Sequence, residues 1–203
     1  MLFTAFVIRL QCRLVVCYYC WMKKLVLFGD SLFAQAGKHR LLMLEQALPG
    51  YDVYNCAVGG WDTNDCVGKA PYIAKLEPDV LVISLGTNDA APWKQVPIEK
   101  FKENIPKIFN SFSKAKIVYF LPTPVDEVKI ANTDARRRIK GIKEYHDAAL
   151  EVCEAQGIAY INSFAIFKPF LDSGKDYHVE DGVHFNDFAY EIIAGELAKI
   201  LST

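Results

Sequence analysis

The sequence has little net charge, no disulfide framework and no apolar run long enough to cross a bilayer. Its 203 residues carry a formal net charge of −1, which gives no electrostatic reason to expect a nucleic-acid partner. A membrane-spanning helix requires about 20 apolar residues, and no run approaches that length. Repeats, low-complexity segments and internal linkers are also missing. What remains is a chain of one domain's length, long enough to bury a full core.

Six cysteines are present, but they do not form the pattern of a small secreted domain held together by disulfides. A domain of this size does not need such bridges. We interpret Cys56, Cys66 and Cys153 as free thiols in a reducing compartment. This interpretation predicts a cytoplasmic protein.

Residues 1–21 differ in composition from the rest, because they contain no acidic residue, two arginines, three cysteines and many large apolar side chains. The arginines interrupt the apolar stretch, and the residues before Met22 make a poor cleavage site, so a secretory signal is disfavoured. Cys17 and Cys20 have the C-x-x-C spacing of redox and metal sites, and Cys12 extends it to an iron–sulfur-like C-x4-C-x2-C, but no fourth cysteine is suitably placed. We predict an N-terminal extension over 1–21 that is not part of the core, with Met22 as the natural start. The alternative is a targeting segment, in which case the protein would be exported.

Residues 22–203 are predicted to form a single domain of alternating strands and helices. Short apolar runs bounded by turn residues indicate buried parallel strands, and the longer stretches between them have helical periodicity. The five expected strands are Leu25–Phe28, Tyr51–Asn55, Val80–Leu85, Lys116–Leu121 and Ile158–Ile161. The expected helices are 33–44, one within 61–76, one that Pro97 opens, 133–156 and 186–201, with Val125–Thr133 as the longest loop. Such alternation predicts a three-layer α/β/α fold with a five-stranded, mostly parallel sheet.

Ser31 follows the first strand directly, in the run Gly29-Asp30-Ser31-Leu32. A serine at that junction lies at the carboxyl end of a strand and at the amino end of a helix. Unpaired backbone N–H groups and the positive end of the helix dipole are close to it. Negative charge that develops on a substrate oxygen would be stabilised there. Taken alone, however, Ser31 is better explained as a helix N-cap.

In sheets of this kind ligands bind beyond the carboxyl ends of the strands, and several polar groups follow the predicted strands. A glycine pair that ends at Gly60 follows the second strand, and Asn88 follows the third. Asp181 and His184 follow the fifth strand at a greater distance. We therefore expect these groups to share one rim of the sheet with Ser31.

Acyl transfer requires this combination of groups. Serine is a weak nucleophile that needs a general base within hydrogen-bond reach, and histidine titrates in the right range. Asp181 is three residues before His184, close enough on a turn to orient the base and stabilise the imidazolium. The N–H groups of Ser31 and Gly60 and the amide of Asn88 are suitable donors to an oxyanion. The sequence therefore predicts Ser31, His184 and Asp181 as catalytic residues.

Taken together, four motifs resemble the GDSL-type esterases of the SGNH hydrolase family, named for a serine, a glycine, an asparagine and a histidine in four blocks. One block arises often by chance, but here all four occur in the family's order. They are Gly29-Asp30-Ser31-Leu32, Gly60, Gly86-Thr87-Asn88-Asp89 and Asp181-x-x-His184. The resemblance covers about Lys23 to Ser202. It implies a flavodoxin-like fold and ester hydrolysis without a cofactor or metal.

His178 is the rival for the role of general base, since it lies only three residues before Asp181. We prefer His184 because the order Asp-x-x-His and the helix that follows match the family. Trp61 and Phe185 lie beside predicted site residues, and we expect them to line the substrate pocket, with core or rim packing as the alternative.

Four acidic residues near the same rim suggest a metal phosphohydrolase as a competing interpretation. No paired histidines support a metal, so this interpretation ranks well below the esterase. The four residues are Asp30, Asp62, Asp65 and Asp89.

We predict a serine esterase that hydrolyses carboxylic esters, with short-chain acyl or acetyl esters as substrates, through an acyl-enzyme on Ser31. The alternatives among enzymes are a lysophospholipase or thioesterase and a carbohydrate acetylesterase. A non-catalytic acyl- or sugar-binding module on the same scaffold is the alternative from another class, and the intact catalytic set argues against it. The expected partner is a small-molecule ester, and nothing in the sequence indicates an oligomeric state.

Overall fold

One parallel sheet runs through the described part of the chain. The computed structural model describes residues 22–131 and 138–202, so the predicted extension over 1–21 lies outside the described residues. The strands pair in the flavodoxin-like order β2-β1-β3-β4-β5, and all four pairings are parallel. Their bounds are β1 Lys23–Gly29, β2 Tyr51–Asn55, β3 Val80–Ser84, β4 Lys116–Phe120 and β5 Ala159–Ile161. The predicted five-stranded α/β architecture is confirmed.

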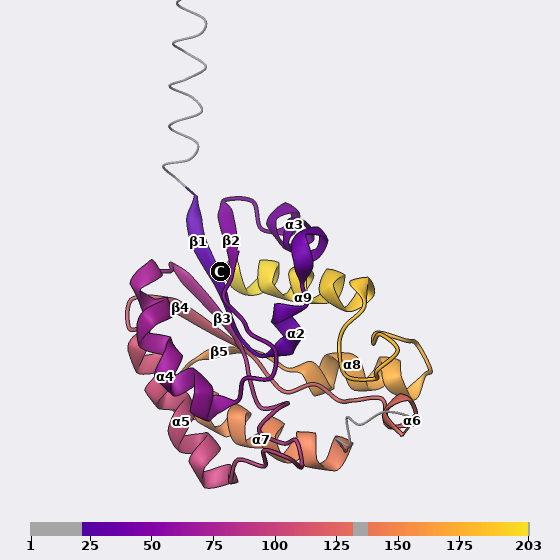
Figure 1. The fold of residues 1–203 in the computed structure, drawn as a ribbon. Helices are drawn as coiled ribbons and strands as arrows, with labels where there is room; N and C mark the ends of the chain where they lie inside the picture. The colour runs from indigo at the N-terminus through magenta and orange to yellow at the C-terminus, as the bar shows by residue number, and fades with distance from the viewer. Residues whose placement is uncertain (1–21, 132–137, 203) are drawn as a thin grey trace, which may run out of the picture.

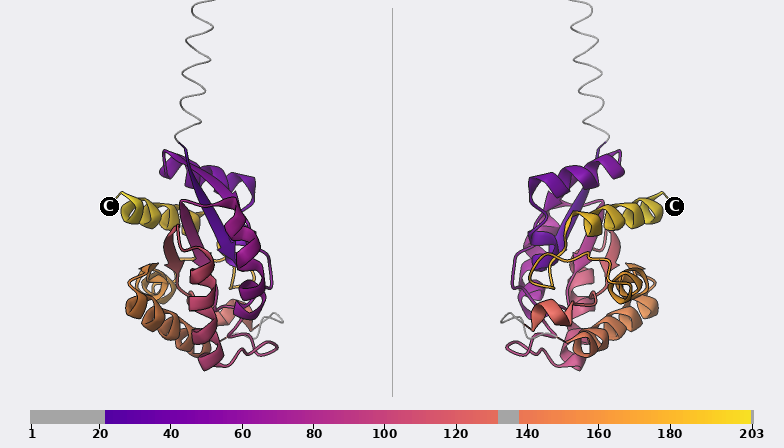
Figure 2. Two further views of the ribbon diagram at one scale, coloured as in Figure 1. Left: turned by 90° about the vertical axis from the view of Figure 1, so that its left-hand side faces the viewer. Right: turned by 90° about the vertical axis from the view of Figure 1, so that its right-hand side faces the viewer.

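Helices cover both faces of the sheet, as Figures 1 and 2 show. α3, α8 and α9 pack on one face, and α4, α5 and α7 pack on the other. The helices are α2 Ser31–Ala34, α3 Gly37–Ala47, α4 Thr63–Ile73, the 3-10 helix η1 Ala74–Leu76, α5 Ile98–Ser111, α6 Glu127–Ile130, α7 Ile139–Gln156, α8 Ser163–Asp172 and α9 Asp187–Leu201. Three layers result, as predicted.

The side chains of β1 alternate between the two faces of the sheet. Leu25 and Leu27 pack in the core cluster that contains α3 and α9, whereas Val26 and Phe28 pack in the cluster that contains α4 and α5. All four side chains are completely buried. Because both faces must be apolar, the strand appears in the sequence as a continuous apolar run and not as an alternating one.

The helix predicted over residues 33–44 is two helices. α2 ends at Ala34, and α3 begins at Gly37, whose φ is +57°. That left-handed conformation interrupts the helix, and glycine adopts it without a steric penalty. As a result, α2 is a single turn that follows β1 directly and carries Ser31 at its first position (Figure 1).

Two further helices differ from the prediction. α6 lies in the segment predicted to be the longest loop, with Asp126 as its N-cap. α8 lies between the fifth strand and the last helix, where no helix was predicted, and its N-cap Asn162 accepts a hydrogen bond from the N–H of Ala165 at 3.0 Å. Pro169 lies inside α8, and because proline normally ends helices, nothing in the sequence indicates this one. The described part of the helix predicted over 133–156 begins at Ile139.

β1 and β3 approach each other closely at their carboxyl ends. Gly29 has a φ of +131°, and a Cβ atom there would lie 2.0 Å from the carbonyl oxygen of Ser84, so only glycine fits. The N–H of Asp30 donates to the same carbonyl at 3.0 Å, and the Asp30 carboxylate accepts a hydrogen bond from the Ser84 hydroxyl at 3.2 Å. These bonds fix the backbone immediately before Ser31.

The cysteines of the described residues, Cys56, Cys66 and Cys153, are free thiols, as predicted. Burial raises the pKa of all three thiols and so disfavours the reactive thiolate. No helix in the described part of the chain is both long and apolar enough to cross a membrane.

Candidate active site

Ser31 is the first residue of α2, and its hydroxyl does not cap the helix. The N-cap is Asp30, whose Oδ1 accepts a hydrogen bond from the N–H of Leu32 at 3.0 Å. The interpretation of Ser31 as an N-cap is therefore wrong, because the preceding carboxylate already occupies that position. The Ser31 hydroxyl bonds instead to a residue from the far end of the chain.

Side-chain hydrogen bonds connect Ser31 to Asp181 through His184. Ser31 Oγ lies 2.7 Å from His184 Nε2, and His184 Nδ1 lies 2.5 Å from Asp181 Oδ2. A ring nitrogen that faces a carboxylate carries a proton, so in the neutral imidazole Nε2 is the acceptor for the serine hydroxyl. The three residues predicted to be catalytic thus meet in one geometry, with His184 between the other two.

The turn that contains Asp181 holds its carboxylate in place. Oδ1 accepts hydrogen bonds from the N–H groups of Val183 at 2.8 Å and His184 at 2.9 Å, while Oδ2 faces the imidazole. Partial burial by itself raises the pKa of this carboxyl. The hydrogen bonds from His184 and Val183 outweigh burial, and the pKa of Asp181 lies below its ordinary value. The carboxylate is therefore charged at neutral pH.

The connection between β4 and α7 braces the same turn, which the sequence did not predict. The N–H of Asp126 donates to the carbonyl of Gly182 at 2.8 Å. A Cβ atom on Gly182 would lie 2.7 Å from the Asp126 carbonyl oxygen, so the two segments approach as closely as glycine allows. Lys129 Nζ adds a bond to the carbonyl of Val179 at 3.3 Å. The only signal in the sequence is the glycine directly after Asp181.

The glycine pair after β2 lies beside Ser31. A Cβ atom on Gly59 would be 3.8 Å from the Cβ of Ser31, and Gly60, with a φ of +85°, has open space around its Cα. The side chain of Asn88 is nearly buried, and its Nδ2 donates to the carbonyl of Trp61 at 2.8 Å. Because Trp61 directly follows Gly60, this bond joins the loops that carry Gly60 and Asn88.

His178, the rival base, does not bond to Ser31. It is 3% exposed, and its Nε2 donates to the carbonyl oxygen of Pro124 at 3.1 Å. Burial lowers the pKa of His178 to about 4, although the bond to Pro124 opposes the shift. This histidine is a neutral packing residue against the ring of Tyr177.

The four acidic residues of the rim bind protein groups. Asp30 accepts from Leu32 and Ser84, as described above, and Asp62 and Asp65 form a reciprocal capping box at the start of α4. Lys94 Nζ lies 3.0 Å from the carboxylates of both Asp62 and Asp65. Asp89 accepts hydrogen bonds from Thr63 and from the N–H of Gly86. Within the described residues, no group of three or more potential metal ligands occurs.

The expectation that Phe185 lines the substrate pocket is wrong. The side chain is 1% exposed and stacks on Phe167 with ring centroids 5.7 Å apart. His178 and Phe185 form an isolated antiparallel bridge, in which successive side chains point to opposite sides. His184 faces Ser31, so Phe185 faces the core. Trp61 is partly exposed and packs edge-to-face on Phe28, with ring centroids 6.1 Å apart.

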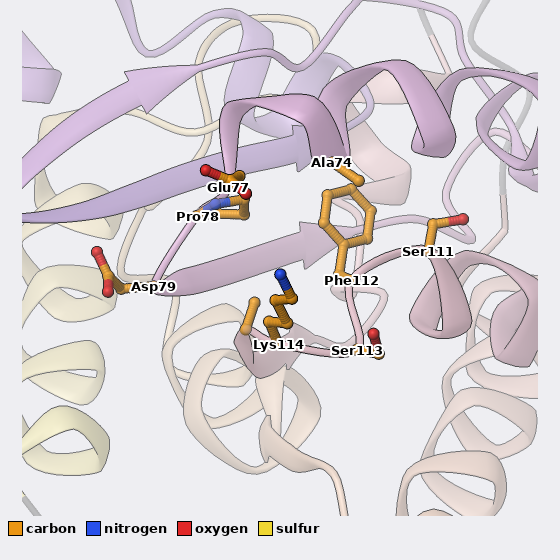
Figure 3. Close-up of a pocket in the computed structure, with 9 residues that line it drawn as sticks. Ala74, Glu77, Pro78, Asp79, Ser111, Phe112, Ser113 and Lys114 are labelled. Atoms are coloured by element: carbon orange, nitrogen blue, oxygen red, sulfur yellow. The ribbon is translucent and has the colours of Figure 1, made fainter.

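A cavity of about 380 Å³ lies away from these residues, at the amino ends of β3 and β4. Figure 3 shows Lys114 reaching into it near Phe112, with Asp79 at the edge of the cavity. Asp79 directly precedes β3, whereas Ser31, Gly60 and Asn88 all follow carboxyl ends of strands. The cavity is therefore at the opposite edge of the sheet from the hydrogen-bonded serine.

Comparison with known proteins agrees with this geometry. The sequence model of the GDSL-like Lipase/Acylhydrolase family matches residues 27–192, which include every residue of the hydrogen-bonded series. The chain belongs to this family. As a GDSL-like lipase/acylhydrolase, it is a hydrolase that acts on carboxylic ester bonds.

Three of the proteins that this chain resembles are at most 25% identical to it, and the solved structures among them share its fold. The GDSL esterase/lipase CPRD49 of Arabidopsis thaliana is 25% identical over 201 residues, which cover 88% of this chain and 78% of that protein. The crystal structure of the lipase/acylhydrolase from Enterococcus faecalis is 24% identical and has a TM-score of 0.77, covering 89% of this chain and 95% of that chain. The aryl esterase of M. smegmatis is 15% identical, with a TM-score of 0.71 and coverage of 89% and 98%.

Proposed function

We propose that this chain is a serine esterase that cleaves short-chain acyl or acetyl esters through an acyl-enzyme on Ser31. The observation that carries the proposal is the hydrogen-bonded series Ser31–His184–Asp181 at the carboxyl edge of the sheet. A hydroxyl becomes a useful nucleophile only when a base accepts its proton, and the 2.7 Å distance to His184 Nε2 is within transfer range.

In the first half of the reaction, Ser31 Oγ attacks the ester carbonyl carbon while its proton moves to His184 Nε2. The electrons of the carbonyl π bond move to the carbonyl oxygen, which becomes the oxyanion of the tetrahedral intermediate. Collapse of this intermediate breaks the bond to the alcohol oxygen, which takes the proton from His184 and leaves as the alcohol. Asp181 stabilises the imidazolium in between, because its carboxylate carries the opposite charge next to Nδ1.

In the second half, water replaces the serine as nucleophile. His184 Nε2 takes a proton from water as the oxygen attacks the acyl carbon, and then returns that proton to Ser31 Oγ when the acyl bond breaks. The products are the carboxylic acid and the free enzyme. No cofactor enters either half of the proposed reaction.

The oxyanion is proposed to be bound by the N–H groups of Ser31 and Gly60 and by the amide of Asn88. The first position of a helix supports this role, because its N–H groups have no partner within the helix and lie at the positive end of the dipole. The open space at Gly60 supports it too, since a side chain there would stand in the way of the ligand.

The proposal is tested with p-nitrophenyl acetate and a fluorophosphonate probe. We expect the purified chain to release p-nitrophenol and to lose this activity when the probe phosphonylates Ser31, which mass spectrometry of the proteolysed protein detects. A series of p-nitrophenyl esters of increasing acyl length separates an acetyl esterase from a lysophospholipase-like or thioesterase-like preference. Neither turnover nor labelling would be expected of a binding module, so their joint absence would reject the esterase.

Replacing Asn88 with alanine should lower kcat by about 10²–10³-fold with a smaller change in KM, because the lost donor acts on charge that develops in the transition state. The measurement is a comparison of kcat and KM on p-nitrophenyl acetate. Asn110→Ala, on the exposed surface of α5, is the matched control and should behave as the unchanged protein. An unchanged kcat in Asn88→Ala would remove Asn88 from the proposed oxyanion hole.

A further inference from the structure

Asp89 is a buried carboxylate that connects two loops of the site. Its Oδ1 accepts hydrogen bonds from the N–H of Thr63 at 3.0 Å and from the Thr63 hydroxyl at 2.5 Å. Its Oδ2 accepts a bond from the N–H of Gly86 at 3.1 Å. The residue is completely buried. One side chain thus binds the start of α4 and the turn after β3 at the same time.

Both loops carry a proposed oxyanion donor close to the point where Asp89 holds them. Thr63 is three residues after Gly60, and Gly86 is two residues before Asn88. Because these separations are short, a displacement of Thr63 or of Gly86 would also displace the donor in the same loop. We infer that Asp89 is a positioning residue for the oxyanion hole, which it assembles by fixing the Gly60 loop against the Asn88 loop. This inference rests on the proposed esterase function.

The hydrogen of the Thr63 hydroxyl has a defined direction. Asn104 Nδ2 on α5 donates to Thr63 Oγ1 at 3.2 Å and to Asn64 Oδ1 at 2.9 Å. Because Oγ1 already accepts a bond from Asn104, its own hydrogen points to the Asp89 carboxylate, which can only accept. The hydrogen bonds therefore run in one direction, from Asn104 on α5 to Thr63 and from Thr63 to Asp89, which fixes the orientation of the Thr63 hydroxyl.

Stability alone does not account for an ionised group at this position. Burial raises the pKa of Asp89 to about 6, and the hydrogen bonds from Thr63 only partly offset that shift. When the pKa of an acid is raised in the folded state, the fold loses stability as pH rises from the ordinary pKa of 3.8 to the folded-state value of about 6, so at neutral pH the charge opposes folding. A neutral isostere would remove this opposition. Only the carboxylate can accept hydrogen bonds from all three donors on the two loops, and its neutral isostere cannot.

The deciding variant is Asp89→Asn. An amide has the same shape but only one acceptor oxygen, so its NH2 group must face the donors of either Thr63 or Gly86, and one loop is released. We expect kcat to fall by about 10²-fold, because misplacement of a catalytic group by about 1 Å has effects of that size, with KM changed much less. The melting temperature at neutral pH should not fall along with kcat, because the neutral amide removes the cost of the buried charge.

Two further variants separate positioning from folding. Thr63→Val removes the hydroxyl donor and should lower kcat, whereas Thr63→Ser restores the donor and should recover most of it. Ser163→Ala is the matched control, because Ser163 is also completely buried and donates one hydrogen bond, to Pro122 at 2.6 Å, but connects neither loop. We expect kcat to be unchanged in this control.

A readout that needs no turnover completes the test. In ¹⁵N-labelled protein, Asp89→Asn and Thr63→Val should shift the amide resonances of Gly60 and of the Asn88 side chain, and Ser163→Ala should not. Unshifted resonances in Asp89→Asn would overturn the inference even if the chain proved not to be an esterase. In an active enzyme, an unchanged kcat in Asp89→Asn, or a decrease matched by the Ser163→Ala control, would overturn it while leaving the proposed function intact.

Discussion

Replacing Ser31 with alanine should lower kcat for p-nitrophenyl acetate by about 10⁶-fold, the size of loss that follows removal of the nucleophile from a serine hydrolase triad. In the proposed mechanism the remaining groups bind and polarise the ester, but none of them forms the acyl bond. The fold should be retained, because Asp30 and not Ser31 caps α2, and the Ser31 side chain is only partly buried.

The matched control for that variant is Ser173→Ala, which removes an exposed serine hydroxyl at the end of α8. Its kcat should equal that of the unchanged protein, and all three proteins should share one melting temperature within a few degrees. Equal hydrolysis by Ser31→Ala and the unchanged protein would show that the ester is cleaved elsewhere on the molecule. The cavity at the amino ends of β3 and β4 would then be the next place to examine.

Asp181→Asn should lower kcat by about 10⁴-fold while the fold survives. The reason is the tautomer of His184. The two backbone N–H groups that bind Oδ1 require an acceptor there, so the amide NH2 must take the place of Oδ2 and donate to His184 Nδ1. The imidazole proton then moves to Nε2, which faces Ser31 and can no longer accept the serine proton.

The comparison for this second variant is Asp172→Asn, which removes a carboxylate of an exposed i,i+4 ion pair with Lys168. Such a pair contributes at most about 0.5 kcal/mol, so both kcat and the melting temperature should be unaffected. If Asp181→Asn kept the kcat of this control, orientation of His184 would have to come from another group.

The sequence sufficed for the sheet and for the position of Ser31, because both depend on local patterns. Buried parallel strands must be apolar on both faces, and a serine after such a strand must lie at the carboxyl edge. His184 was preferred over His178 because the order Asp-x-x-His and the helix that follows match the family, and the structure shows why the order matters. The Asp181 carboxylate accepts hydrogen bonds from the backbone N–H groups two and three residues after it, so the turn brings the His184 ring back to that carboxylate.

What the sequence could not predict depends on contacts between distant segments. Phe185 follows a site residue, yet the bridge to His178 turns its ring into the core. The brace between Asp126 and Gly182 joins segments far apart in the chain, and neither residue type indicates the other. The Asp89 bridge was hidden for the same reason, since an Asn-Asp pair after a strand looks like a turn until Thr63 is placed beside it.

The separation of Ser31 and His184 by 153 residues has a consequence for biogenesis. Ser31 leaves the ribosome early, but its base is supplied by the segment before the last helix, and α9 docks on α2 through a hydrogen bond from Tyr190 to the carbonyl of Leu32. Under the proposed mechanism, a nascent chain that has folded only its first strands is inactive. Turnover would begin only when the segment that carries His184 has packed against α2, so the rate at which activity returns on refolding would report this least local step of assembly.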